Sequence, residues 1–280
     1  MPELPELQAH AERLNDRYAG NELERFTPLT FTALKTAVPP ASDAQGHDLA
    51  LVRRRGKHIL VDFGELTFVV HLMQGGRLKE EPLGKQPAKP KTGVARWLFA
   101  DGRSLLLTEA GSERRAGVWA VAGDPESQAP LDTLGPDADT VDVAQLLKLL
   151  HENPMRLHGW LRDQRIIAGI GRRLANEICH RAKLSPYTST AKLTSDDADT
   201  LSDAITVCLD ESLAYERTRD DMSSSADRPG SVHHREGEKC PVCGDTIRAV
   251  EYRSYTIDYC STCQTNGKVL ADNTTSKFLK

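Results

Sequence analysis

Hydrophobic residues recur along the chain with two different periods, and the change of period divides it into regions. A first amphipathic helix is predicted by apolar residues at spacings of three and four, namely Leu4, Leu7, Ala11, Leu14 and Tyr18. Pro5 suits the first turn of this helix, because the missing N–H of proline would have no partner there. Residues 1–4 are therefore expected at or just before a helix N-terminus.

From about residue 20 to residue 135 the pattern is typical of β-structure. Two strands are predicted at 58–63 and 66–72 around Gly64-Glu65, and two more at 95–99 and 104–108 around the hairpin turn Asp101-Gly102. The Pro- and Lys-rich segment 81–92 is predicted to be a loop, and 124–136 is predicted to be an interdomain linker.

Helical periodicity dominates the next region, with helices predicted at 141–152, 154–164, 171–183 and 194–217. The polar stretch 220–238 is expected to be mobile, and a module with four cysteines follows. The chain therefore divides into an N-terminal helix with a β-like region, a linker, a helical region and a cysteine module.

The net charge of −4 argues, taken alone, against binding to nucleic acid. The charges are unevenly distributed, however. Residues 151–183 carry seven Arg or Lys and three acidic residues. Residues 184–227 carry three Arg or Lys and ten acidic residues. Because attraction of a polyanion depends on where the charges lie, the basic segment leaves a nucleic-acid partner open.

The chain shows neither a membrane segment nor a secretory signal. It contains no run of 18 apolar residues, and its first ten residues lack a basic stretch followed by an apolar one. With 39% hydrophobic and 27% charged residues, the composition is that of an ordinary globular protein. We therefore expect a cytoplasmic protein with no membrane partner.

The six cysteines fall into two groups. Cys179 and Cys208 lie within helical patterns and are expected to be buried as small hydrophobic residues. The others form a C-x2-C-x16-C-x2-C pattern, and two such pairs can hold one Zn²⁺ tetrahedrally; they are Cys240, Cys243, Cys260 and Cys263. Four thiolates leave no position open for water, so the predicted zinc is structural.

The N-terminal Pro2-Glu3 permits two interpretations. Removal of Met1 would expose a secondary amine that is partly unprotonated at neutral pH, and a neighbouring carboxyl group could move protons. Such an amine attacks an aldehyde carbon to give a charged iminium ion, a strong electron sink. Alternatively, Pro and Glu are simply favourable residues for the first turn of a helix.

Two further segments are candidates for phosphate binding. The basic run 53–58 precedes a strand, and it fits a phosphate site and a solvated loop equally well. The glycines of Ile167-Ala-Gly-Ile-Gly171 open a helix whose free N–H groups could face a phosphate. This segment lacks the third glycine of a dinucleotide fingerprint and follows a helix, so no nucleotide cofactor is expected.

Together and in this order, these motifs resemble those of the formamidopyrimidine-DNA glycosylase and endonuclease VIII family of base-excision repair enzymes. The resemblance covers nearly the whole chain. It is carried by the N-terminal PELPE, the segment ending at Lys57, His71-Leu72 with Gly76-Arg77-Leu78, Arg114-Arg115-x-Gly117, Leu134-Gly-Pro136, the segments 160–164 and 167–171, Asn176-Glu177 and the stretch 232–263.

The resemblance implies a fold and a partner. The fold is of the α+β class: an N-terminal helix with a β-sandwich (1–135), a helical domain with a helix–two-turn–helix motif (136–222), and a mobile loop followed by a β-hairpin zinc finger (223–280). The partner is damaged double-stranded DNA, bound by a monomer that associates with the nucleoid.

The resemblance also implies a bifunctional DNA glycosylase and abasic-site lyase. Pro2 attacks C1′ of the damaged nucleotide and forms a Schiff base after the base leaves. Glu3 relays protons with Glu6 in support, and Lys57 grips phosphate and assists β-elimination. Further DNA contacts are implied for His71, Gln74, Arg114, Arg172, Arg173 and Arg253.

Several positions depart from the pattern of the family. Arg172 replaces an Asn, and Tyr255 replaces an Arg that grips phosphate and helps δ-elimination, with Arg253 on the same strand face as a candidate substitute. Gln74 stands for an intercalating Met, Ala116 for a wedge Phe and His158 for a Lys. The alternative to an active glycosylase is therefore a catalytically weak or inactive relative that binds damaged DNA.

Overall fold

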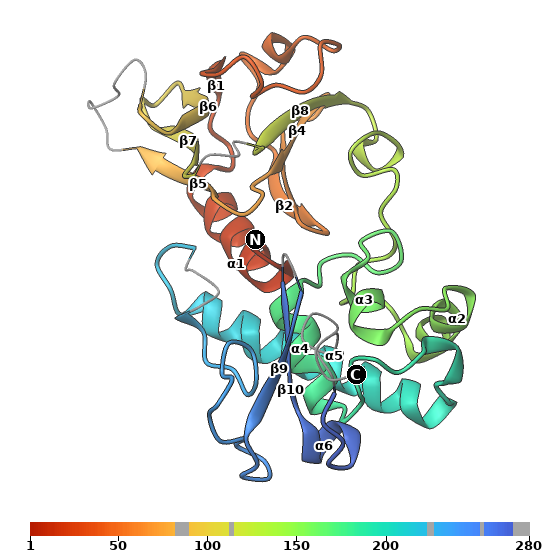
Figure 1. Ribbon diagram of the computed structural model, residues 1–280. Helices are drawn as coiled ribbons and strands as arrows, with labels where there is room; N and C mark the ends of the chain where they lie inside the picture. Colours follow the sequence, from red (N-terminus) through yellow and green to blue (C-terminus); the bar gives the residue numbers. More distant parts are fainter. Residues whose placement is uncertain (82–89, 112–114, 223–226, 253–254, 271–280) are drawn as a thin grey trace. The chain divides into compact units, whose positions relative to one another are not determined.

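The computed structural model describes residues 1–81, 90–111, 115–222, 227–252 and 255–270 (Figure 1). It has two compact units, Met1–Leu134 with Glu216–Ser224, and Gly135–Tyr215 with Ser225–Lys280. The mixed α+β class predicted from the sequence is confirmed. The division differs from the three expected domains, because the four-cysteine hairpin belongs to the same unit as the helical region.

The predicted first helix is present as α1 (Leu4–Tyr18), with the residues of the apolar stripe buried. Its outer face is tied to the C-terminal end of the long helix α5 (Ser195–Arg217), since the Arg217 guanidinium binds both oxygens of Glu12 at 2.7 and 2.9 Å. Met222 completes the attachment by packing into the core of the first unit. This is why Glu216–Ser224 belongs with the N-terminal part.

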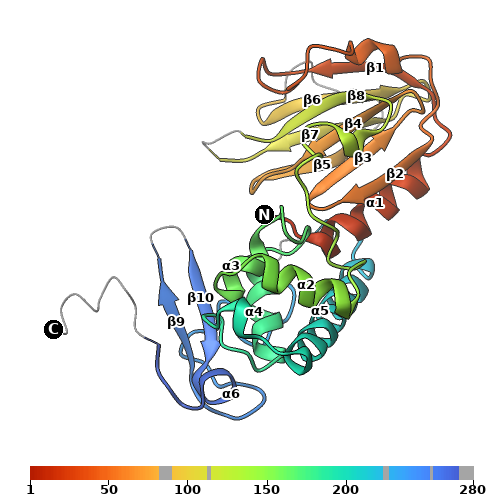
Figure 2. The same cartoon turned by 90° about the vertical axis from the view of Figure 1, so that its right-hand side faces the viewer.

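Two four-stranded antiparallel sheets form the rest of the first unit (Figure 2). One has the order β1-β6-β7-β5 and the other β2-β3-β4-β8. The strands are β1 (Leu23–Pro28), β2 (Leu51–Arg55), β3 (His58–Asp62), β4 (Leu66–His71), β5 (Gly76–Glu81), β6 (Gly93–Phe99), β7 (Ser104–Glu109) and β8 (Gly117–Ala122). One apolar core contains side chains from both sheets and α1, among them Phe26, Phe68 and Trp97.

The turns between these strands follow from local chemistry. Gly102, with a φ of +83°, closes the predicted β6–β7 hairpin, and Asp101 Oδ1 accepts the N–H of Arg103 at 2.9 Å. Gly56, with a φ of +53°, lets β2 turn directly into β3. A residue with a β-carbon would be strained at either position, so both turns depend on glycine.

The predicted linker 124–136 is packed rather than free. It contains the short 3-10 helix η2 (Pro125–Ser127), and Leu131 is 2% exposed against Leu60, Val69 and Val121. These three residues lie on the side of the β3–β4–β8 sheet that does not contribute to the main core. The linker therefore covers a second apolar surface that β-periodicity alone did not reveal.

The second unit contains the predicted helices with shortened ends: α2 (Val143–Glu152), α3 (Leu157–Arg162), α4 (Arg172–Arg181) and most of α5. The predicted start of α3 at 154 is wrong, because the chain before Leu157 is engaged elsewhere. Arg156 forms a bridge with Ser189, and the N–H of Met155 donates to Thr190 Oγ1 at 3.0 Å.

The four-cysteine module closes the described chain with the hairpin β9 (Ile247–Glu251) and β10 (Thr256–Cys260) and the short helix α6 (Ser261–Thr265). The described part of 220–238 is less free than its polar composition indicated, since Val232 is completely buried. No helix among the described residues has the length and apolar character needed to cross a membrane.

Candidate functional site

Pro2 and Glu3 lie at the N-terminus of α1, where the helix fixes both acidic side chains. Met1 is 49% exposed, while Pro2 is buried and Glu3 is 3% exposed. The Glu3 side chain accepts the N–H of Glu6, and Glu6 Oε2 accepts the N–H of Glu3 at 3.0 Å. This capping box holds two carboxylates in defined positions next to the N-terminal segment.

Lys57 is placed by the strand that runs along α1. The N–H of Val52 donates to Asn15 Oδ1 at 2.9 Å, and Arg54 Nε donates to Gln8 Oε1 at 3.1 Å. β2 therefore runs antiparallel to α1, and its C-terminal end lies beside the N-terminal part of the helix. The turn with Lys57 therefore comes at the end of the helix where the chain starts, and Figures 1 and 2 show the β2 arrowhead at that end.

Two histidines adjoin Lys57. His58 and His71 are cross-strand partners on β3 and β4, and their ring centroids are 4.6 Å apart. Burial, with His71 beside it, lowers the pKa of His58 to about 3. Burial, with the Lys57 cation nearby, lowers the pKa of His71 to about 4. Both rings are neutral at pH 7, so the positive charge near them comes from Lys57 and Arg55.

This pair predicts a loss of stability in mild acid. An unfolded histidine titrates near 6.5, so between pH 6.5 and about 4 the unfolded chain binds more protons than the folded chain. The free energy of unfolding is unaffected by this pair above pH 6.5. It falls by about 1.4 kcal/mol per pH unit for each histidine as the pH drops through that window.

Urea unfolding at pH 7 and pH 5 checks the prediction. From pH 7 to pH 5, the free energy of unfolding of His58→Phe should fall by about 2 kcal/mol less than that of the wild type. Substitution of the exposed His47 by Gln should leave the wild-type difference in place. Equal pH dependence in the wild type and His58→Phe would contradict the assignment.

The remaining predicted residues of the first unit differ in their surroundings. Gln74 is exposed on the turn between β4 and β5, where Met73 has a φ of +52° and its N–H contacts His71 Nδ1 at 3.2 Å. Ala116 is 2% exposed, and its N–H donates to Glu109 Oε2 at 2.8 Å. Arg114 lies outside the described residues.

In the second unit, a glycine-containing turn leads into α4. Gly169 has a φ of +102°, and Gln164 clamps the turn by accepting the N–H of Gly169 and donating to the carbonyl of Ile170, both at 2.9 Å. Gly171 is the N-cap, and no side chain caps the first N–H groups of α4, which are the kind of donors that bind an anion at a helix N-terminus. Arg172 is the first residue of the helix and is partly exposed.

Arg173 has different surroundings from its neighbour. It is 5% exposed, and its guanidinium donates to the carbonyl oxygen of Arg228. Its contact is therefore to the chain segment that precedes the four-cysteine module. The predicted site residue Arg253 lies outside the described residues.

The sequence analysis missed how one face of α4 holds the segment 231–234. The Glu177 carboxylate accepts the N–H groups of Ser231, Val232 and His233 at 2.7 to 3.1 Å. Asn176 Nδ2 donates to Asp258 Oδ2 on β10 at 3.0 Å. The adjacent Asn176-Glu177 was noticed as a motif, but periodicity could not identify partners more than 50 residues away.

The four predicted cysteines come together. Their sulfur atoms all lie within 4.8 Å of one another, with 3.4 Å between Cys243 and Cys260 and 3.9 Å between Cys240 and Cys263. Tetrahedral coordination with Zn–S bonds of about 2.3 Å separates sulfur atoms by about 3.8 Å. The cluster can therefore hold one metal ion, and its all-sulfur donor set fits zinc.

Asp245 ties the two cysteine pairs together from outside the cluster. Its Oδ2 accepts the hydroxyls of Ser261 at 2.8 Å and Thr262 at 2.9 Å, both from the second pair. These bonds lower the pKa of Asp245 to about 2. Asp245 also accepts the N–H of Cys240 through its carbonyl oxygen at 2.7 Å, so it bridges both pairs.

Tyr255, at the position where the resemblance implied an arginine, is part of an aromatic stack. The Arg162 guanidinium carbon lies 4.4 Å from the centre of the Tyr255 ring, and the Tyr252 ring stacks on it at 4.7 Å and 10°. The Tyr252 hydroxyl is 2.8 Å from that of Tyr187. The stack ties the end of the hairpin to the helical part of this unit.

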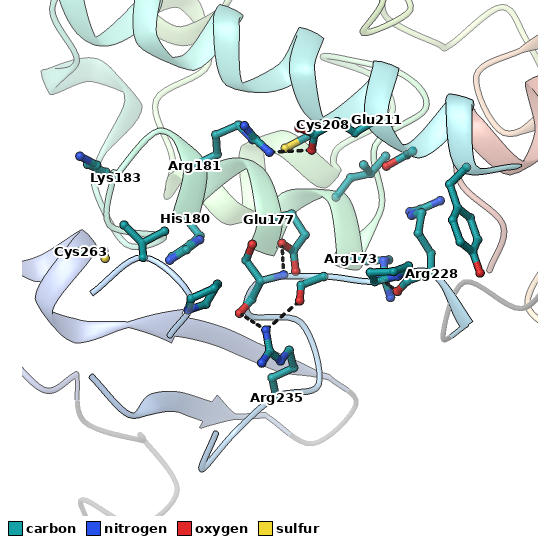
Figure 3. Close-up of a pocket in the computed structure, with 18 residues that line it drawn as sticks. Arg173, Glu177, His180, Arg181, Lys183, Cys208, Glu211, Arg228, Arg235 and Cys263 are labelled. Atoms are coloured by element: carbon teal, nitrogen blue, oxygen red, sulfur yellow. Dashed lines mark hydrogen bonds and ion pairs between the residues drawn. The ribbon is translucent and has the colours of Figure 1, made fainter. Parts of the chain in front are cut away.

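A cavity of about 630 Å³ lies among α4, α5, the segment 228–235 and the cysteine module (Figure 3). Its acidic residues are engaged, because Glu177 binds the backbone of 231–233 and Glu211 binds Arg181 at 2.6 Å. Cys208 lines this cavity, and burial raises the pKa of its thiol to about 11. Cys179 and Cys208 are 1% and 6% exposed, so their predicted burial is confirmed.

The sequence matches two family models, the formamidopyrimidine-DNA glycosylase N-terminal domain over residues 1–119 and the formamidopyrimidine-DNA glycosylase H2TH domain over residues 133–224. An uncharacterized formamidopyrimidine-DNA glycosylase-like protein of Mycobacterium tuberculosis is 40% identical over 169 residues, which are 57% of this chain and the full length of that protein.

Two further relatives match over nearly the whole chain. The formamidopyrimidine-DNA glycosylase of Roseiflexus sp. is 30% identical over 278 residues, 94% of this chain and 100% of its own. The MutM (Fpg) protein of Thermus thermophilus has a similar structure, with a TM-score of 0.80, 26% identity and coverage of 94% of this chain and 98% of that one. The fold and the domain matches define a DNA-repair glycosylase architecture. This chain belongs to the formamidopyrimidine-DNA glycosylase family.

Proposed function

We propose that this protein is a base-excision repair DNA glycosylase with abasic-site lyase activity, acting on damaged double-stranded DNA. The observation that carries the proposal is the N-terminal Pro2, held next to the carboxylates of Glu3 and Glu6 at the end of α1 where β2 delivers Lys57. Membership in the family supports DNA as the substrate. We further propose that the protein acts as a monomer in the cytoplasm, without a nucleotide cofactor.

The proposed chemistry starts from the Pro2 amine after removal of Met1. An α-amino group has a pKa near 8, so an appreciable fraction carries a free lone pair at neutral pH. The lone pair attacks C1′, the bond from C1′ to the damaged base breaks, and the base leaves with a proton. Glu3 relays protons at the sugar, and Glu6 holds Glu3 in place through the capping box.

The second half of the reaction uses the resulting iminium ion as an electron sink. A proton leaves C2′, the electron pair forms a C2′–C3′ double bond, and the 3′ phosphate departs. Lys57 binds the phosphate and stabilises its charge, and water then hydrolyses the Schiff base to free Pro2. Because His58 and His71 are neutral at pH 7, these two rings add no positive charge beside Lys57.

DNA binding is assigned to both units. Arg172 and the N–H groups at the start of α4 are the proposed phosphate ligands of the second unit. Arg173, whose guanidinium donates to the Arg228 carbonyl, stays a predicted DNA contact. His71 and Gln74 are proposed contacts of the first unit, and Arg114 and Arg253 stay predictions. One Zn²⁺ bound by the four cysteines would provide a structural cross-link and no open coordination position.

Borohydride trapping on a duplex with an abasic site tests the proposal. Borohydride reduces the Schiff base to a stable amine, so the wild-type protein should form a covalent adduct that peptide mapping places on Pro2. Binding to the abasic duplex without any adduct would favour the inactive DNA-binding relative. An adduct on Lys57 would contradict the assignment of the nucleophile.

The salt dependence of DNA binding should show phosphate neutralisation despite the net charge of −4. For each phosphate neutralised, the slope of log affinity against log salt concentration changes by roughly −0.9. We expect Arg172→Ala to flatten this slope by about one contact. Lys148→Ala, which removes an exposed cation paired with Glu152 on α2, should retain the wild-type slope. A wild-type slope in Arg172→Ala would place Arg172 outside the interface.

The departures from the family pattern predict the substrate range. Ala116 provides no aromatic wedge, and base–aromatic stacking is worth about 1–3 kcal/mol. An abasic site has no base to hold and little stacking to break, so single-turnover cleavage should be faster for abasic sites than for 8-oxoguanine opposite cytosine. With Tyr255 engaged by Arg162 and Tyr252, β-elimination products should dominate.

Tyr255→Arg provides the matched test of the second expectation, because it restores the residue implied by the family. It should increase the share of β,δ-elimination products. Fastest excision of 8-oxoguanine opposite cytosine by the wild type, with complete δ-elimination, would show that other residues replace the missing wedge and arginine.

A further inference from the structure

His180, near the C-terminal end of α4, contacts a sulfur atom of the four-cysteine cluster. Its Nε2 lies 3.3 Å from Cys240 Sγ, and both residues are buried, at 4% and 3% exposure. Figure 3 shows the His180 ring on the wall of the cavity that also includes Cys263. Nothing in the C-x2-C spacing of the sequence points to this residue, which lies 60 positions before Cys240.

The chemistry of a metal site decides the direction of this hydrogen bond. A metal-bound cysteine is a thiolate without a proton, so its sulfur can only accept and Nε2 must carry the hydrogen. Four thiolates and one divalent ion leave two excess negative charges on the cluster. An N–H donor to one sulfur reduces this charge, and charge-assisted hydrogen bonds are stronger than neutral ones.

His180 shares its helix face with the residues that hold the rest of the module. Asn176, Glu177 and His180 have the spacing of one face of α4, and they bind Asp258, the backbone of 231–233 and Cys240 respectively. The same helix presents Arg172 at its other end. α4 therefore connects the proposed phosphate site directly to a metal ligand.

We propose that His180 is a positioning residue of the metal site, which donates Nε2–H to the Cys240 thiolate, strengthens metal retention and fixes the cysteine module on α4. The proposal rests on the zinc site proposed above. Gln264 provides a contrast, because it docks the module through backbone groups, accepting the N–H of Cys260 at 2.8 Å and donating to the Leu184 carbonyl at 3.1 Å.

Zinc release from the full-length protein to a chelator, without DNA, measures the effect. Loss of a hydrogen-bond partner of a metal ligand typically costs 10- to 100-fold in metal affinity, so His180→Phe should release zinc about 10- to 100-fold faster. His180→Gln, which keeps an N–H donor, should recover part of the loss. His151→Phe removes a histidine whose ring contacts the Leu193 carbonyl instead of a sulfur atom, and it should release zinc at the wild-type rate.

Spectroscopy separates a hydrogen bond to sulfur from simple packing. In the Co²⁺-substituted protein, His180→Phe should shift the thiolate-to-metal charge-transfer bands to lower energy, while Gln264→Leu should leave them in place. In the unmutated ¹¹³Cd-substituted protein, the Nε2–H proton of His180 should show a scalar coupling to the metal across the N–H···S bond. This measurement does not depend on whether any variant folds.

The outcomes distinguish the proposal from its premise. Wild-type protein without bound zinc would contradict the metal site itself. Full metal occupancy with no coupling from His180, or equal zinc release by the wild type and His180→Phe, would overturn the role of His180 and leave the metal site standing. If His180→Phe and His180→Gln accelerated zinc release equally, the effect would come from packing and not from the hydrogen bond.

Discussion

Inserting one residue between Met1 and Pro2, so that a residue remains ahead of Pro2 after Met1 is removed, is expected to abolish borohydride trapping on abasic DNA. The added residue converts the secondary amine into an amide, which has no lone pair available to attack C1′. Pro2→Gly keeps an amine but makes it primary, and it should reduce trapping at least about tenfold, because its imine is charged only when protonated. Quantitative trapping followed by peptide mapping measures both effects.

Two controls isolate the role of the amine. Pro5→Ala changes the other proline at the start of α1, where Pro serves the first helical turn, and it should keep wild-type trapping. Glu3→Gln retains an oxygen that can accept the N–H of Glu6, so the helix cap should survive while the acid is lost. Base removal should then slow by about 10²- to 10⁴-fold, with a smaller effect on preformed abasic sites. Unchanged trapping in the extended chain would rule out Pro2 as the nucleophile.

Cys240→Ser is expected to unfold the cysteine module and leave the first unit folded. The apolar cluster of the module contains Val232, Cys240, Ile247 and Cys260, which is too small to stabilise a hairpin alone. Structural zinc contributes on the order of 10 kcal/mol in finger peptides, so loss of one ligand removes the main stabilising term. The first unit has its own core around Phe68 and Trp97 and does not depend on the metal.

Metal analysis and amide hydrogen exchange measure this outcome. The wild type should contain one zinc per chain, and in Cys240→Ser the amides of β9 and β10 should lose protection while those of β3 and β4 retain it. DNA binding should weaken as well, because the segment 231–233 that Glu177 holds leads directly into this module. Cys208→Ala, at a cysteine outside the cluster, should keep its zinc. A zinc-free or fully active Cys240→Ser variant that keeps the hairpin would contradict the prediction.

The sequence by itself determined the features that depend on local spacing. α1 begins and ends where the apolar stripe does, at Leu4 and Tyr18, because a 3.6-residue period and a proline in the first turn are local properties. The β6–β7 hairpin follows from Asp101-Gly102 in the same way. The four cysteines are a set that the C-x2-C spacing identifies before any fold is known, and their sulfur atoms do meet.

The tertiary structure alone decided which groups from distant segments meet. It placed Lys57 at the start of α1 through the pairing of β2 with the helix. It also buried Arg173, which the resemblance implied as a DNA contact, and Leu131, which was expected in a linker. It also ordered the polar segment after 227, because the Glu177 carboxylate satisfies three of its N–H groups. The physical reason is common to these cases: a polar or apolar group at one position is satisfied by a partner in a distant part of the chain, and no local period encodes where that partner lies.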